Sequence, residues 1–456
     1  MQTTAEHEQY LKMTATPIPK LVLSLAWPSI VSMIITSIYN TADAYFVSQI
    51  STSASGAVGI VMPIMALMQA IGFTFAIGAG SQIAQLLGAK KLDKANVYAS
   101  SSLAIGLLSG FVITILGVWQ LDRLLILFGA TPTILPYAKD YASVILFGAP
   151  IYISQFVLNL QLRSQGKNKL SMIGLMTGGL LNIILDPIFI FTLGFGIRGA
   201  AIATVLSQLV SWNILRWMVK NRSLLTVGLK SVSQKFAVYR SIVGTGISSF
   251  LRQGLASIAI ILLNNAAGQF GDEVIAATVI VGRISMILIA LILGVGQGFQ
   301  PIAGYNYGAQ KYSRVRASWR FTFLMMTGIV SLAGIAMFLL APRLVESFRD
   351  DPTVVRVGST MLRYLSISLM FQPMLVSTNM LLQTTTHIKA ASFLASTRQG
   401  LFFIPLLIIL PPILGIPGIQ IAQPIADVMS AVVSIPFLIY FMKNLPKEDG
   451  TPDPIG

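Results

Sequence analysis

The sequence contains no cysteine, which excludes disulfide bonds and thiolate metal sites. It is also poor in charge, because Asp, Glu, Lys and Arg make up only 10% of the 456 residues, against roughly 25% in soluble domains. Its two histidines, His7 and His387, are too few for a histidine-based metal centre. There is no Walker A sequence and no Gly-x-Gly-x-x-Gly turn after a strand. ATP is therefore not the energy source within this chain.

Hydrophobic residues make up 54% of the chain, and the mean hydropathy is +0.76. No water-soluble fold of this length covers so much apolar surface, so lipid is the expected solvent. Residues 1–13 are polar and do not resemble a signal peptide. A bilayer core needs about 20 apolar residues per helix. Twelve such runs predict an all-α membrane protein with spans at 20–47, 56–80, 94–118, 137–162, 168–193, 197–219, 236–267, 275–300, 315–341, 355–382, 390–414 and 417–441.

The net charge is +15, and the basic residues lie mostly in the loops between these runs. This distribution does not suggest nucleic acid as a partner. If the N-terminus is cytoplasmic, 21 Lys and Arg fall on the cytoplasmic side and 6 on the other, with 4 inside or at the edge of spans. Cytoplasmic loops of membrane proteins carry an excess of these residues. The sequence therefore predicts a multi-pass protein of the bacterial inner membrane with both termini in the cytoplasm.

The two halves of the chain repeat one another at offsets of 220, 222 and 219 residues. The matching pieces are Gly88-Ala89 with Gly308-Ala309, Gln161 with Gln383, and the run that begins at Gly196 with the run that begins at Gly415. Each half has six predicted spans, so the halves share one topology about an axis along the membrane normal. Such duplication is typical of transporters whose binding site lies between two lobes.

The repeat predicts two pseudo-two-fold related six-helix lobes. The N-terminal lobe is expected at residues 1–218 and the C-terminal lobe at 241–456, with a basic cytoplasmic linker at 219–240.

Three of the 16 acidic residues lie well inside apolar runs: Asp43, Asp186 and Asp427. A buried carboxylate costs about 2.5–3.5 kcal/mol on insertion scales, so each one indicates a function. Helical spacing puts Tyr39 and Asn40 on the face of Asp43, and Asn182 on the face of Asp186. We expect these residues and Thr204 to form one polar chamber in the outer half of the N-terminal lobe.

Carboxylates held away from water resist ionisation, so they can accept a proton outside and release it inside. Alternatively, Na⁺ binds to the oxygens of four residues: Asp43, Asp186, Asn182 and Thr204. Pro28, in the middle of the first span, permits a kink and is a candidate hinge. Asp427 is a candidate second-lobe site. For Arg252 and Arg283, near or in spans seven and eight, a structural role is expected.

These residues together resemble the multidrug and toxic compound extrusion (MATE) family over residues 18–442. The resemblance rests on Pro28, Tyr39-Asn40-x-x-Asp43, Gly88-Ala89, Arg163-x-x-Gly166-x-x-Lys169, Asn182-x-x-x-Asp186-Pro187 and Gly196-Ile197-Arg198-Gly199-Ala200-Ala201-x-Ala203-Thr204. The Asp43 and Asp186 pair resembles the DinF-like branch of that family, and the sequence is similar to MepA-type bacterial exporters. In the DinF-like branch, a first-lobe Asp pair is implicated in proton or Na⁺ coupling. The resemblance implies this role for Asp43, Asp186, Asn182, Thr204, Tyr39 and Asn159.

The branch related to NorM uses acidic residues in spans seven and ten, where this chain has Asn264, Asn265, Gln372 and Pro373. That departure argues against second-lobe coupling of the NorM kind.

The predicted function is multidrug efflux by H⁺ or Na⁺ antiport, which makes the chain a secondary active transporter and not an enzyme. The expected substrates are amphipathic organic cations. The protein is expected to act as a monomer in the bilayer, without a cofactor beyond the coupling ion.

Two alternatives remain open. A lipid-linked oligosaccharide or lipid flippase of a related fold requires a cationic central cavity. A membrane prenyl transferase requires clustered carboxylates for Mg²⁺, whereas adjacent acids such as Asp350-Asp351 are expected in an outer loop with Pro352.

Overall fold

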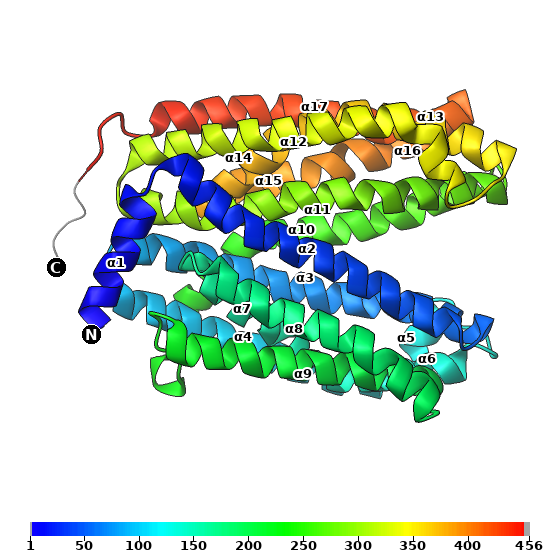
Figure 1. The fold of residues 1–456 in the computed structure, drawn as a ribbon, viewed down its shortest axis with the longest axis horizontal. Coiled ribbons are helices and arrows are strands. Elements are labelled where there is room, and N and C mark those ends of the chain that lie inside the picture. Colours follow the sequence, from blue (N-terminus) through cyan, green and yellow to red (C-terminus); the bar gives the residue numbers. More distant parts are fainter. Residues whose placement is uncertain (1, 451–456) are drawn as a thin grey trace.

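The chain is helical in all of the long segments that the structure, a computed structural model, describes over residues 2–450, and this range contains no strand. Figure 1 shows the helices in two neighbouring bundles, the N-terminal and C-terminal lobes. The N-terminal lobe consists of α2 (Ile18–Ser48), α3 (Thr52–Gly88), α4 (Leu92–Trp119), α6 with α7 (Leu135–Phe147 and Ala149–Ser164), α8 with the π-helix η1 (Asn168–Pro187 and Ile188–Thr192) and α9 (Gly196–Arg222).

The C-terminal lobe has the same order of spans. It consists of α10 (Phe236–Gly268), α11 (Asp272–Gly308), α12 (Tyr312–Glu346), α13 with the 3₁₀ turn η3 and α14 (Pro352–Ser368, Leu369–Phe371 and Gln372–Thr384), α15 with the π-helix η4 and α16 (Ile388–Ser396, Thr397–Phe403 and Ile404–Leu414) and α17 (Ile416–Asn444). Three short elements lie outside the spans: α1 (Gln2–Ala15), α5 (Leu121–Leu127) and η2 (Leu229–Ser231).

Ten spans in the described range are long and apolar enough to cross a bilayer, and an eleventh, Leu135–Ser164, bends by 49° between α6 and α7. The bend follows from Pro150, which has no N–H to donate to the carbonyl of Leu146. The hydroxyl of Thr114 donates to that carbonyl instead, at 2.6 Å. The remaining span of the twelve is α9, the sixth along the chain. It is long enough to cross a bilayer but less apolar than the others, because its buried inner face carries polar residues such as Thr204 and Ser211. The predicted all-α, twelve-span fold is confirmed.

The backbone repeats at an offset of 220 residues. Helix α3 spans Thr52–Gly88 and α11 spans Asp272–Gly308, and the turns that follow them place Lys90 and Gln310 at the same positive φ of 57°. The turns after α7 and α14 likewise contain Gly166 and Thr386 with positive φ, again 220 residues apart.

This offset corrects one of the matches predicted from the sequence. Gln383 corresponds to Arg163 and not to Gln161, because the positive-φ turn residues fix the register of the two halves.

The two lobes touch tightly at the end of the molecule that carries both α1 and the end of α17 (Figure 1). There Gly88 of α3 faces Gly308 of α11. A Cβ at Gly88 would lie 2.0 Å from the carbonyl oxygen of Tyr305, and a Cβ at Gly308 would lie 1.9 Å from that of Gln85. No side chain fits at these two positions, so glycine permits the backbones of opposite lobes to touch.

Helix α2 belongs to both lobes, and Figure 1 shows it running obliquely from one bundle to the other. Ala26 and Ile30 pack in the same hydrophobic cluster as Ile292 and Val295 of α11. Further along, α2 packs against α8 of the N-terminal lobe. The helix therefore connects the core of the C-terminal lobe to the region around Asp43.

Helix α1, for which the sequence predicted no membrane span, crosses the seam between the lobes at the same end. Lys90 of the N-terminal lobe lies over the ring of Tyr10, 4.7 Å from its centroid. From the C-terminal lobe, Arg314 donates from Nη2 to the carbonyl of Thr16 at 2.6 Å, and Asn306 donates to that of Met13 at 3.1 Å. The start of the chain thus binds both lobes.

Candidate functional site

A cluster of buried polar side chains lies in the N-terminal lobe, near the end of α8. Asn182 donates from Nδ2 to Asp186 Oδ1 at 3.0 Å and lies 3.4 Å from Thr204 Oγ1 of α9. All three side chains are buried, and Asp186 is fully buried. The second carboxylate oxygen of Asp186 has no hydrogen-bond partner. Such an oxygen is unusual, because buried polar atoms in proteins are nearly always paired.

Asp43 and Tyr39 reach the same region from α2. The ring of Tyr39 packs against Gly179 of α8, about one turn before Asn182, where a Cβ would lie 3.0 Å from Tyr39 Cδ1. The charges of Asp43 and Asp186 lie within electrostatic reach of one another. Asp43 Oδ1 is also buried without a hydrogen-bond partner. The structure thus brings together five of the site residues predicted from the sequence, which come from α2, α8 and α9: Tyr39, Asp43, Asn182, Asp186 and Thr204.

Two tyrosines that the sequence analysis missed line this cluster. Tyr141 of α6 is fully buried, its hydroxyl has no partner, and it lies within electrostatic reach of both Asp43 and Asp186. Tyr152 of α7 is close to Tyr39. A tyrosine in an apolar helix carries no sequence signal of its own, because its ring suits a lipid-facing or core position equally well.

Asn159 lies elsewhere. It donates from Nδ2 to the hydroxyl of Ser171 at 2.6 Å and to the carbonyl of Ser171 at 3.2 Å, near the start of α8. Ser171 and Asn182 are 11 residues apart, which is about 16 Å along a helix. The equivalent Asn379 makes the same kind of bond to the carbonyl of Ala391, at 2.6 Å. Asn159 and Asn379 therefore each tie together two consecutive spans of their own lobe, and the hydrogen bonds of Asn159 go to Ser171 and not to the carboxylates.

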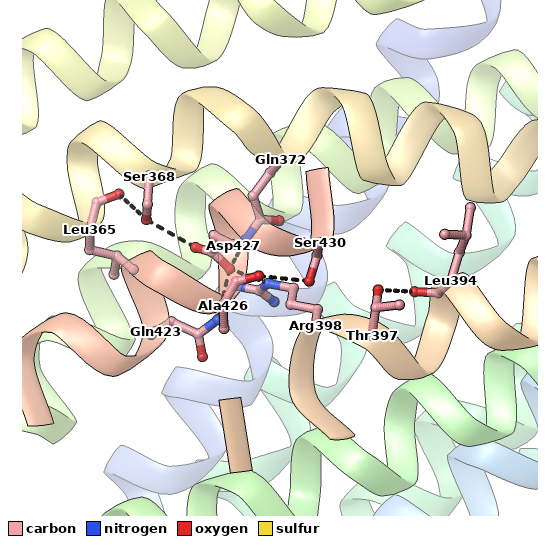
Figure 2. Close-up of polar contacts among 10 residues, drawn as sticks. All are labelled: Leu365, Ser368, Gln372, Leu394, Thr397, Arg398, Gln423, Ala426, Asp427 and Ser430. Atoms are coloured by element: carbon pink, nitrogen blue, oxygen red, sulfur yellow. Dashed lines mark hydrogen bonds and ion pairs between the residues drawn. The ribbon is translucent and has the colours of Figure 1, made fainter. Parts of the chain in front are cut away.

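Asp427 is buried in the C-terminal lobe and is fully partnered (Figure 2). Its Oδ1 accepts from Arg398 Nε at 2.7 Å and from Gln423 Nε2 at 2.8 Å, and its Oδ2 accepts from the hydroxyl of Ser368 at 3.0 Å. Helix α17 continues unbroken through Pro424 and Asp427, so this stretch does not cap a broken helix. The carboxylates of the two lobes thus differ in kind, unpaired in one and ion-paired in the other.

The remaining charged candidates show no comparable environment. Arg252 is half-buried on α10 and Arg283 is exposed on α11, and neither has a carboxylate within 4 Å in the described residues. Asp351 accepts from the backbone N–H groups of Thr353 and Val354 and thereby caps α13. No group of three His, Cys, Asp or Glu residues suited to a metal ion occurs in residues 2–450.

Pro28 is buried within α2, between the two residues that pack in the C-terminal-lobe cluster. The hydroxyl of Ser32 donates to its carbonyl at 2.8 Å. Proline removes the backbone bond to the residue four positions earlier, so this is the point of α2 with the weakest helical ladder.

Comparisons with known proteins agree with this architecture. The chain is 26% identical over 439 residues to the multidrug export protein MepA of Staphylococcus aureus (strain bovine RF122 / ET3-1), covering 96% of this chain and 97% of that protein. A solved structure described as the outward-facing conformation of a multidrug resistance MATE family transporter superposes with a TM-score of 0.90, at 28% identity, over 96% of this chain and 99% of the other.

A second solved structure, of a transporter from Pyrococcus furiosus Vc1, also has a TM-score of 0.90, at 27% identity, over 96% of this chain and 99% of the other. Its description states that a reversed polarity of the binding pocket suggests a different function. The MatE family model matches residues 28–188 and again residues 248–409, once in each lobe and 220 residues apart at their starts. This chain therefore belongs to the MatE family, the multidrug and toxic compound extrusion transporters.

Proposed function

We propose that this protein exports amphipathic organic cations across the bacterial inner membrane in exchange for H⁺ or Na⁺, as a monomer and a secondary active transporter. Both termini lie in the cytoplasm in this proposal, as the distribution of Lys and Arg predicts. Residues 1–218 and 241–456 move as two units. The linker 219–240 stays with the first unit, because its backbone N–H at Thr226 donates to Asn96 Oδ1 at 2.8 Å.

The observation that carries the proposal is the pair of carboxylates with free buried oxygens in the N-terminal lobe. Asp186 Oδ2 and Asp43 Oδ1 are buried and have no hydrogen-bond partner. A charged oxygen in such a place is costly unless a proton or a cation neutralises it. Asn182 and Thr204 supply neutral oxygens beside it, which suits either H⁺ or Na⁺. The site therefore exchanges cations at little cost in structure.

Cation binding at this site reaches the other lobe through α2. Asp43 and Tyr39 lie at one end of this helix, and Ala26 and Ile30 lie in the hydrophobic cluster of the C-terminal lobe. Pro28, which lies between Ala26 and Ile30, weakens the helical ladder at the end of α2 that packs in this cluster. Neutralising Asp43 changes the electrostatic interaction between the Asp43 end of α2 and Asp186 of α8, and so changes the free energy of their present packing. A shift of α2 then changes how the two lobes pack.

The membrane potential drives this exchange when more positive charge enters with the coupling cations than leaves with the drug. One net elementary charge that crosses 100 mV yields about 2.3 kcal/mol. At about 1.4 kcal/mol per factor of ten, each net charge supports roughly a 40-fold substrate gradient, and an exchange without net charge movement draws on the H⁺ or Na⁺ concentration gradient alone. Organic cations are the fitting substrates, because they compete for the same negative charge that binds the coupling ion.

Replacing Asp186 with Asn tests the assignment. We expect Asp186→Asn to abolish efflux of a fluorescent cationic dye from proteoliposomes, under either a pH gradient or a Na⁺ gradient, while the protein still inserts and purifies normally. Asp140→Asn is the matched control, because Asp140 is exposed on α6. Unchanged dye efflux by the Asp186→Asn variant would refute the site.

Flipping of a lipid-linked oligosaccharide or another lipid is the second candidate, and one observation favours it. Arg163 is buried between the lobes, donates to Ser171 and Gln297, and has no carboxylate within 4 Å in the described part of the chain. A cationic cavity of this kind suits a phosphate. The cavity at Arg163 measures only about 20 Å³, however, which is room for one or two waters. Translocation of a fluorescent lipid in vesicles by the purified protein would favour the flippase.

A further inference from the structure

The two lobes treat their buried carboxylates in opposite ways. In the N-terminal lobe, Asp43 and Asp186 each have an oxygen without a partner. In the C-terminal lobe, both oxygens of Asp427 accept hydrogen bonds. In the run that begins at Gly196 and its match at Gly415, the offset is 219 residues, so Asp427 of α17 corresponds to Gln208 of α9, one helical turn from Thr204. Both lobes therefore place polar groups at the same level of their last span, but only one of them leaves a charge uncompensated.

The partners of Asp427 come from three spans and are rich in oxygen. Ser368 and Gln372 flank the 3₁₀ turn Leu369–Phe371 of the tenth span, and Gln423 lies one turn before Asp427 on α17. Figure 2 shows these side chains converging on the carboxylate. A 3₁₀ turn inside a span is a local departure from the α-helical ladder, and such departures often mark functional positions.

Arg398 enters this group from the eleventh span, within the π-helical segment Thr397–Phe403. The amide of Gln372 can be placed in two ways. One puts its nitrogen 3.3 Å from Asp427 Oδ1, and the other puts its oxygen 2.8 Å from Arg398 Nε and 2.5 Å from Nη2. The second satisfies both groups, because otherwise the amide nitrogen faces the donors of Arg398. Oxygens of Asp427 and Gln372 then both point at the guanidinium.

The guanidinium thus occupies a position against two oxygens, Asp427 Oδ1 and that of Gln372, which are the kind of ligands that bind a small cation. The side chain of Asp427 is completely buried and that of Arg398 is 20% exposed, so the arginine reaches in from a more accessible position. Within residues 2–450, it is the one cationic side chain within 4 Å of Asp427. Its charge is covalently attached to the chain and cannot be exchanged during transport.

We propose that Arg398 permanently fills a cation site of the C-terminal lobe, and that removing its charge turns Asp427 into a second exchangeable site for H⁺ or Na⁺. The inference deepens the proposed function, on which it rests for the role of the N-terminal site. It explains why the chain keeps a buried carboxylate in its second lobe without using it for coupling. The residue that sets the number of exchanged cations is then Arg398, on a different span from either carboxylate of the working site.

The test compares Arg398→Gln with wild type, as full-length protein in nanodiscs and in proteoliposomes. We expect Arg398→Gln to bind one additional cation per protein, counted by radioactive Na⁺ binding and by proton uptake in an acid–base titration. Arg398→Lys is the matched control, because it keeps a tethered charge and should show the wild-type count. In the double variant Arg398→Gln/Asp427→Asn, the additional cation should disappear. An unchanged count in folded Arg398→Gln would overturn the proposal.

If Arg398→Gln does not fold, the double variant decides the question, since it replaces the ion pair by two neutral amides. We measure the number of cations exchanged per transported tetraphenylphosphonium ion from the reversal potential. If the double variant has the wild-type number, Asp427 does not exchange a cation in the wild-type protein, as proposed. A lower number shows that Asp427 takes part in wild-type coupling and contradicts the proposal. A wild-type protein that exchanges no cation refutes the proposed function alone, because the gain in Arg398→Gln is measured separately by binding.

Discussion

The close approach of Gly88 to the opposite lobe makes a sharp prediction about conformational balance. An alanine Cβ at this position would lie 2.0 Å from the carbonyl oxygen of Tyr305 and 2.9 Å from the backbone nitrogen of Ala309. Real Cβ atoms keep about 3.4 Å or more from such atoms, so α3 and α11 would have to separate by more than 1 Å. Because these helices belong to different lobes, the strain is relieved by opening the seam and not by unfolding.

The size of the effect follows from the cost of overpacking, which is typically about 1–3 kcal/mol. At about 1.4 kcal/mol per factor of ten, Gly88→Ala should shift the balance between closed and open seam by roughly 5-fold to 150-fold toward the open form. In the proposed topology, the open form faces the cytoplasm. Drug binding from the cytoplasmic side should therefore become easier, and release to the outside should become slower.

The absence of cysteine makes this shift easy to measure. A single cysteine at Ser81, which is buried and lines the cavity between the lobes, reports on opening when labelled with a water-soluble maleimide. We expect faster labelling in the Gly88→Ala background. Gly59→Ala on the same helix is the control, because a Cβ there meets nothing within 4 Å. Equal labelling rates in all three backgrounds would refute the argument that this glycine holds the seam closed.

Three further substitutions separate structural from functional roles. Asn159→Ala should lower the melting temperature, since losing its bonds to Ser171 costs about 1–3 kcal/mol, with the ratio of cations to drug unchanged; an altered ratio would show that Asn159 takes part in coupling. Tyr141→Phe removes a buried, unpartnered hydroxyl, so it should raise stability by about 1 kcal/mol while weakening cation-driven efflux; full efflux would exclude the hydroxyl from the site. Pro28→Ala should slow exchange between lobe arrangements, followed by spin-label distances, and unaltered rates would mean a static kink.

Composition and helical spacing were sufficient for most of the fold, because twelve apolar runs and a repeat leave few alternative topologies. The sixth span, α9, shows the limit of hydropathy alone. Its polar residues Thr204 and Ser211 face inward onto α8, so the run at 197–219 is less apolar than the other predicted spans. The bend at Pro150 was not predicted, since its consequence depends on Thr114 of a neighbouring helix, far away in sequence.

For the candidate site, intervals of four residues correctly grouped neighbours within one helix, as with Asn182 and Asp186. Contacts between helices were harder to predict. The pair of Arg398 and Asp427 joins different spans, and no local pattern connects residues 29 positions apart. Asn159 was placed with the carboxylates by resemblance, whereas its partner, Ser171, is visible only once the two helices are packed.

The position of α1 has a practical consequence for anyone who handles this protein. Lys90, from one lobe, lies over Tyr10 of this helix, and Arg314, from the other, donates to the carbonyl of Thr16 just after it, so the beginning of the chain links the two lobes like a strap. In the described residues after α17, 445–450, the hydrogen bonds to other elements go to the C-terminal lobe, where Asp449 accepts from the backbone N–H of Ser313 at 2.8 Å. A purification tag or fluorescent reporter fused at the front would pull on that strap and bias the transporter toward one arrangement, whereas the same addition at the back would leave the joint untouched.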